Sequence, residues 1–141
     1  MADEKQLPAY PPNVTVENEE FWKAAADGRF LLKRCDADGC GTVIWYPRSL
    51  CPECGSFDTS WFEASGKGTI YTYTIVHKGQ GPWAEHVPYV TAYVELEEGP
   101  RVMTNIVGVD PADVAVGMAV EVVFQDAGDG AAIYRFRPAI P

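Results

Sequence analysis

The sequence contains four cysteines, and they fall into two closely spaced pairs. Cys35 and Cys40 form the first pair, and Cys51 and Cys54 form the second. Ten residues separate the pairs, which is enough chain for a hairpin that returns the second pair to the first. Four soft thiolates at this spacing favour a tetrahedral Zn²⁺ site, with rubredoxin-type iron as the second candidate. No other feature of the sequence constrains the fold as strongly.

The cysteine quartet predicts a structural metal and not a catalytic one. A catalytic zinc keeps one coordination position for water or substrate, whereas four cysteines fill the shell. A redox role for Cys51-Pro52-Glu53-Cys54 is disfavoured, because such a motif needs a helix N-terminus to lower the thiol pKa, and Gly55 and Ser56 follow instead. Residues 34–55 have almost no apolar core of their own, so we expect them to lose their fold without the metal.

Length and composition bound the class of protein. A chain of 141 residues has room for one modest domain, or for a small module joined to a compact barrel. No stretch approaches the ~20 apolar residues of a membrane span, so we expect no membrane association. Residues 1–6 show no apolar signal core. Together with cysteines in metal-binding spacing, this predicts a protein of the reducing cytoplasm.

Charge is unevenly distributed along the chain, which has a net charge of −9. Between Glu85 and Asp129 there are nine acidic residues against the single basic residue Arg101. Between Phe21 and Arg48 the balance reverses, with five basic residues against three acidic ones. The N-terminal half can therefore face an anionic partner, while the C-terminal half would repel one.

The N-terminal half divides into three segments. Residues 1–14 are rich in proline and predict an extended arm. Residues 15–28 predict a helix that Thr15 or Asn18 caps, that its alanines favour and that Gly28 ends. Its narrow apolar face must pack either on the body of the protein or on a partner. Residues 29–62 predict the zinc ribbon, with an extended segment at 29–34 and a strand at 42–46 between the cysteine pairs.

Residues 63–141 predict a β-barrel. Five β-rich stretches are separated by Gly, Pro or Asp, at 68–78, 88–97, 100–107, 119–125 and 131–137. The first alternates, which places Ile70, Thr72 and Thr74 on one face and Tyr71, Tyr73 and Ile75 on the other. Five strands in about 70 residues are too few for a sandwich of two sheets. The prediction is a mainly β protein with an N-terminal helix, a rubredoxin-like zinc ribbon and a five-stranded oligonucleotide/oligosaccharide-binding (OB) barrel.

An OB barrel raises the hypothesis of single-stranded nucleic-acid binding. Four tyrosines could form a stacking platform, although packing within the sheet is the commoner role for such residues; they are Tyr71, Tyr73, Tyr89 and Tyr93. Nucleic-acid affinity depends on Lys and Arg releasing counterions from phosphates. Because the predicted barrel is acidic, we expect no nucleic-acid partner.

The longest loop between barrel strands is flanked by the two histidines, His77 and His86, and carries Trp83. Trp83 either folds back as a lid on the barrel or is presented to a partner. A catalytic histidine needs a nucleophile or a carboxylate held against it, and the sequence pattern establishes no such pairing, so a structural or ligand-contact role outweighs general-base catalysis. Arg48 and Lys67 lie beside turns, where each is either solvated or available to a phosphate or an acidic partner.

The order of these segments resembles the zinc-ribbon plus OB-fold proteins of "domain of unknown function" family 35, from about residue 15 to the end. The resemblance rests on Phe21-Trp22, Cys40-Gly41, Tyr46-Pro47-Arg48, Cys51-Pro52-Glu53-Cys54-Gly55, Gly66–Thr74, Val116–Val120 and Phe136-Arg137-Pro138. One departure is visible. The family usually has two residues between its first cysteines, and here there are four.

The resemblance implies a non-catalytic accessory subunit that assembles with a thiolase-fold enzyme, either a thiolase or a lipid-transfer-protein-like aldolase. It also implies acyl-CoA at or near the shared interface, with steroid side-chain or fatty-acid degradation as the setting. Candidate contacts to acyl-CoA or to the partner are Arg48, Lys67, His77, Lys78 and Trp83. Two alternatives stay open: a stand-alone acyl-CoA-binding module, and a nucleic-acid-binding OB protein.

Overall fold

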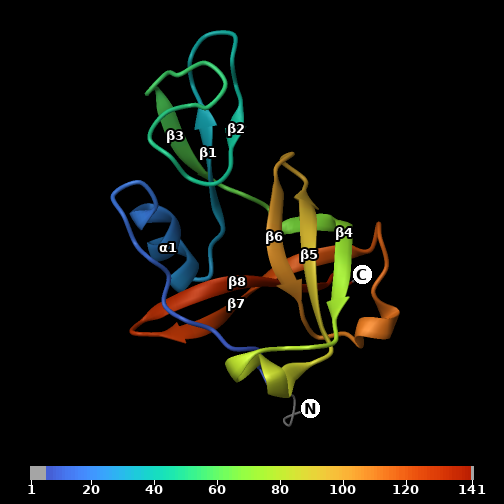
Figure 1. Ribbon diagram of the computed structural model, residues 1–141. Coiled ribbons are helices and arrows are strands. Elements are labelled where there is room, and N and C mark those ends of the chain that lie inside the picture. Colours follow the sequence, from blue (N-terminus) through green and yellow to red (C-terminus); the bar gives the residue numbers. More distant parts are fainter. Residues whose placement is uncertain (1–5, 141) are drawn as a thin grey trace.

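The computed structural model describes residues 6–140, and Figure 1 shows a small three-stranded sheet standing at one end of a barrel, with one helix beside both. The first five residues of the expected arm lie outside the described part. The helix is α1 (Glu19–Ala26), and the small sheet contains β1 (Leu31–Cys35), β2 (Val43–Ile44) and β3 (Thr59–Glu63). The barrel strands are β4 (Lys67–Val76), β5 (Tyr89–Leu96), β6 (Arg101–Ile106), β7 (Ala119–Gly128) and β8 (Ala131–Pro138). Two short 3₁₀ helices, η1 (Gly81–His86) and η2 (Pro111–Asp113), lie in the loops.

Helix α1 covers fewer residues than the expected range 15–28, because hydrogen bonds of the Asn18 side chain hold the preceding residues in a non-helical conformation. The Asn18 side chain accepts a hydrogen bond from the Thr15 backbone N–H (2.7 Å) and donates to the Tyr46 hydroxyl (3.1 Å). It therefore makes no side-chain cap to the first turn, although it occupies the N-cap position. Glu19 and Glu20 in that first turn are favourably placed at the positive end of the helix dipole.

The apolar face of α1 packs on the body of the protein. Phe21 is fully buried, and its ring contacts aromatic rings from the ribbon and from the barrel. We call this cluster the aromatic junction; its members are Phe21, Trp22, Phe30, Trp45, Tyr46 and Tyr134. Ring centroids in the cluster lie 4.8–6.3 Å apart, mostly edge to face, as favourable aromatic packing requires. One cluster thus joins the helix, the ribbon and the barrel.

The ribbon sheet has the order β2-β1-β3, and all of its pairings are antiparallel. The expected strand at 42–46 is reduced to Val43–Ile44, while β3 was not expected. Strand β3 pairs with the whole of β1, from Leu31 opposite Glu63 to Cys35 opposite Thr59. On this sheet the Lys33 ammonium group lies 5.0 Å from the centre of the Trp61 ring, which is within cation–π range.

The five remaining strands form a closed barrel with the order β4-β5-β6-β8-β7. Neighbouring strands are antiparallel except β6 and β8, which pair in parallel through Ile106 and Phe136. Closure comes from β4, whose first residues pair with β7. The interior is filled by fully buried side chains that include Ile70, Val94, Val102, Val120 and Phe136. The prediction of a mainly β protein with a five-stranded barrel is confirmed.

The alternation expected for the first barrel strand is wrong beyond Ile70. The pairing of β4 with β5 shifts register between Ile70 and Thr72, so Tyr71 occupies a β-bulge. Ile70 points into the core, but after the bulge it is Tyr73 and Ile75 that pack against the core, while Thr72 is exposed. Strand β4 can bend around the barrel because of this irregularity.

Gly68 on β4 is required by the close approach of β5. A Cβ atom at this position would lie 2.5 Å from the Glu95 carbonyl oxygen and 2.8 Å from a Val94 methyl group. We therefore expect Gly68→Ala to lower the free energy of unfolding by about 1–3 kcal/mol, the usual cost of overpacking. Urea denaturation measures the change. The neighbouring Thr69→Ala, which shortens an exposed side chain, is the control; an equal loss in both variants would contradict the steric explanation.

Within residues 6–140, no helix has the length and apolar character needed to cross a membrane.

Candidate metal centre and barrel cleft

The four cysteine sulfur atoms converge at the outer part of the ribbon. All four lie within 4.8 Å of one another, and none of the cysteines forms a disulfide. Two of the separations join one cysteine of each pair, 3.5 Å from Cys35 to Cys54 and 3.7 Å from Cys40 to Cys51. Zn–S bonds of about 2.3 Å in a tetrahedron place sulfurs about 3.8 Å apart. The donor set and its spacing therefore fit a tetrahedral Zn²⁺ ion.

The wider first pair reaches the cluster because the intervening chain closes into a turn. Cys35 ends β1, and the Cys40 backbone N–H donates to the Ala37 carbonyl (3.1 Å). Gly39 and Gly41 on either side of Cys40 have φ angles of +77° and +69°, a conformation that glycine adopts without strain. The four residues between Cys35 and Cys40 thus form a turn, and the sulfur of Cys35 still lies with the other three.

Electrostatics in the quartet favour a bound cation. The Thr42 hydroxyl, 3.2 Å from the Cys40 sulfur, lowers the pKa of Cys40 to about 6. The Ala37 backbone N–H favours the thiolate of Cys35, but burial and the three neighbouring sulfurs outweigh it and raise the pKa of Cys35 to about 12. Four thiolates this close repel one another, and a divalent cation among them offsets that repulsion.

The five residues expected to contact acyl-CoA or a partner do not converge on one site. Arg48 lies between the cysteine pairs, where its carbonyl accepts a hydrogen bond from the Lys33 ammonium group (3.3 Å) and the next residue, Ser49, donates to the Glu17 carboxylate (2.6 Å). Lys67 begins β4, while His77 and Lys78 follow its other end, up to roughly 30 Å away along ten residues of strand. Trp83 lies in η1 and folds back on the barrel, with its ring 4.8 Å from that of Tyr89.

The four tyrosines do not form one platform either. Tyr71 and Tyr93 are about half exposed on adjacent strands, and the Arg101 guanidinium lies 3.8 Å above the Tyr71 ring. Tyr73 instead packs against the core, and Tyr89 packs against Trp83.

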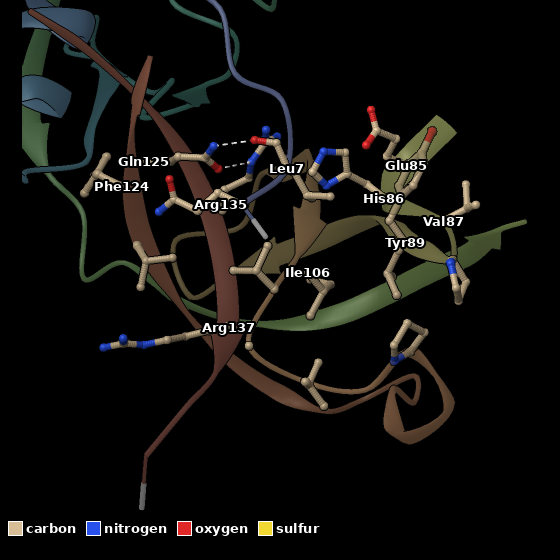
Figure 2. A pocket seen from close by; sticks show the side chains of 18 residues that line it. Leu7, Glu85, His86, Val87, Tyr89, Ile106, Phe124, Gln125, Arg135 and Arg137 are labelled. Carbon is tan, nitrogen blue, oxygen red and sulfur yellow. Dashed lines mark hydrogen bonds between the residues drawn. The ribbon is translucent and has the colours of Figure 1, made fainter. Parts of the chain in front are cut away.

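A cleft of about 590 Å³ opens at the η1 end of the barrel, and sequence reasoning did not identify it. Its walls come from the N-terminal arm, the end of η1, β6 and the β7–β8 hairpin (Figure 2). The polar residues that line it are Gln6, Glu85, His86, Gln125, Arg135 and Arg137. Arg135 is only 7% exposed, since the arm covers it. Nothing in its alternating strand sequence signals this burial, because the covering residues lie more than 120 positions away.

Models of known families match both parts of the chain. The ChsH2 rubredoxin-like zinc ribbon domain matches residues 22–60, and the ChsH2 C-terminal OB-fold domain matches residues 61–125. A DUF35 domain-containing scaffold protein from Methanocaldococcus jannaschii is 39% identical over 117 residues, which is 78% of this chain and 83% of the relative. This chain belongs to the DUF35 family. The predicted family and its structural zinc ribbon are thereby confirmed.

Other DUF35 relatives are parts of larger proteins or assemblies. A probable enoyl-CoA hydratase alpha subunit from Thermomonospora curvata is 39% identical over 130 residues. The match covers 92% of this DUF35 chain but only 40% of that subunit, so the chain spans about two fifths of the relative's length. The solved structure of the Ltp2-ChsH2(DUF35) aldolase contains a chain that superposes with a TM-score of 0.80 at 39% identity. The match covers 92% of this chain and 99% of that one.

Proposed function

We propose that this DUF35 protein is a non-catalytic accessory subunit that binds a thiolase-fold enzyme acting on acyl-CoA and supports its activity. A thiolase or a lipid-transfer-protein-like aldolase is the expected partner, with steroid side-chain or fatty-acid degradation as the setting. The observation that carries the proposal is the likeness to the ChsH2(DUF35) chain of an aldolase, which extends over almost the whole of both chains.

The chemistry of the described residues supports an accessory role. We propose that Cys35, Cys40, Cys51 and Cys54 all bind one zinc ion, which leaves no position open for substrate. The metal then orders the ribbon and takes no part in catalysis. Because the candidate acyl-CoA contacts are spread over the ribbon, the two ends of β4 and η1, we propose that residues of the partner complete any acyl-CoA site.

Exposed apolar side chains offer a docking surface. The apolar face of α1 packs on the body of the protein, and the half-buried Trp83 packs against Tyr89. On the barrel, Tyr71, Tyr93 and Met103 lie on three adjacent strands and are 44–56% exposed. We propose that this stripe faces the thiolase-fold partner, since large apolar groups gathered on a surface commonly mark protein contacts.

Co-expression with the candidate enzyme tests the proposal. We expect the two chains to co-purify, and we expect the isolated DUF35 chain to show no carbon–carbon bond cleavage. Met103→Glu places a charge in the stripe and should weaken co-purification at least tenfold, whereas Val116→Glu, which changes an exposed residue outside the stripe, should not. Robust lyase or thiolase turnover by the isolated chain would contradict an accessory role. Tight binding of CoA esters by the isolated chain in calorimetry would instead favour a stand-alone binding module.

A further inference from the structure

Arg135 on β8 is a buried cation that is held only by neutral groups. Its Nε atom donates to the Gln125 side-chain oxygen (3.1 Å), and one terminal nitrogen donates to the Asn105 side-chain oxygen (2.6 Å). The other terminal nitrogen donates to the Pro8 carbonyl (2.7 Å). A guanidinium carries five N–H groups, so one on each terminal nitrogen remains for a further acceptor.

The charge of Arg135 has no carboxylate partner among residues 6–140. The ion pairs of the described chain join other residues; Arg137, two positions along β8, pairs with Glu121 at 3.0 Å. Burial lowers the pKa of Arg135 from its ordinary value, because the neutral groups around the guanidinium replace only part of the solvation of its charge. A buried charge without a counter-ion is costly, and an anion that enters the site recovers part of that cost.

The cleft beside Arg135 has the size and lining of a small-molecule site. Its volume of about 590 Å³ is within the usual range for ligand pockets. Its apolar walls include Leu7, Val87, Ile106, Val123 and Phe124. Figure 2 shows Gln125 and Arg135 directed toward Leu7, with His86 and Glu85 on the neighbouring wall. The cleft therefore combines one anchoring cation with an apolar interior.

We propose that this cleft binds a small aliphatic monocarboxylate, whose carboxylate meets the two remaining N–H groups of Arg135 and whose chain lies against the apolar walls. Planar guanidinium and carboxylate groups match in a two-point hydrogen-bonded pair. A monoanion suits the site better than a phosphate dianion, because Arg135 is a single buried cation with no carboxylate partner among residues 6–140, while Arg137 of the same cleft is paired with Glu121. This site is separate from the partner surface and from the metal centre.

Titration of the zinc-loaded full chain with sodium octanoate, followed by ¹H–¹⁵N NMR, tests the proposal. We expect saturable shifts at cleft residues and none in the ribbon. Octanamide has the same chain without the charge, and it should bind at least tenfold more weakly, since hydrogen bonds to charged groups are the stronger kind. Octyl phosphate should also bind more weakly than octanoate. Equal affinity for the acid and the amide, or tighter binding of the phosphate, would overturn the proposal.

Two substitutions separate the cleft from general effects on the fold. Val107→Trp fills the cleft while leaving Arg135 in place, and it should weaken octanoate binding at least tenfold. Val116→Trp introduces the same side chain at an exposed position that does not line the cleft, and it should leave binding unchanged. Equal effects of the two variants would contradict the assignment. Octanoate binding tests the cleft, and co-purification with the enzyme tests the proposed function. Because the two measurements are separate, either proposal can fail while the other holds.

Discussion

Replacing Cys51 with serine is expected to abolish zinc binding and to unfold the ribbon. Cys51 is fully buried, and its sulfur lies 3.7 Å from that of Cys40. Apart from its cysteines the ribbon tip buries little more than Ile44, so metal binding must supply most of its order. Structural zinc contributes on the order of 10–16 kcal/mol in small zinc-dependent folds. Elemental analysis should fall from one zinc per chain to none, and NMR signals of residues 35–58 should collapse.

Cys35 provides the sharper test of the same site, because four residues separate it from Cys40. The structure places its sulfur 3.5 Å from that of Cys54, so we expect Cys35→Ser to lose zinc as completely as Cys51→Ser. Ser60→Ala, on the exposed side of β3, is the control that should retain the metal. A Cys35→Ser protein that keeps one zinc per chain would show that three cysteines suffice.

Phe21→Ala is expected to lower the free energy of unfolding by about 3–5 kcal/mol, which is the usual cost of removing a buried phenylalanine side chain. Phe21 is fully buried at the centre of the aromatic junction, so its loss leaves a cavity shared by the helix, the ribbon and the barrel. Urea denaturation, followed by tryptophan fluorescence, measures the change, since Trp22 and Trp45 report directly on this cluster.

Phe57→Ala is the matched control for this measurement. It removes the same side chain from the ribbon, where Phe57 is 74% exposed, and should change stability by less than about 0.5 kcal/mol. If the two variants lost equal stability, the junction would not be what couples the parts of the protein.

The features that the sequence predicted well are those with a local cause. The cysteine spacing predicted the metal centre, and alternating β-rich stretches between Gly and Pro predicted all five barrel strands. Strand β3 was missed, because Thr59–Glu63 is short and becomes a strand only by pairing with β1. The bulge at Tyr71 was missed for a related reason, because its position is set by the register of the pairing between β4 and β5.

The candidate sites were harder to predict than the fold. His77, Lys78 and Trp83 were predicted as contacts to acyl-CoA or to a partner, whereas the structure packs the Trp83 ring on Tyr89. Arg135 reads as an ordinary exposed residue of an alternating strand, but residues 7 and 8 of the arm cover that face of the β7–β8 hairpin. Contacts between the two ends of a chain leave no local pattern that sequence reasoning can detect.

The central position of β8 sets an order in which this protein can be assembled during synthesis. The ribbon strands and all four cysteines lie between Leu31 and Glu63, so this unit can take up its metal while the rest of the chain is still being translated. The barrel cannot close until β8 leaves the ribosome, because β6 and β7 both pair with that strand. The packing of α1 and of the arm is completed at the same point, since Tyr134 contacts Phe21 and Arg135 bonds to the Pro8 carbonyl. Among residues 6–140, β8 is the strand that completes the barrel.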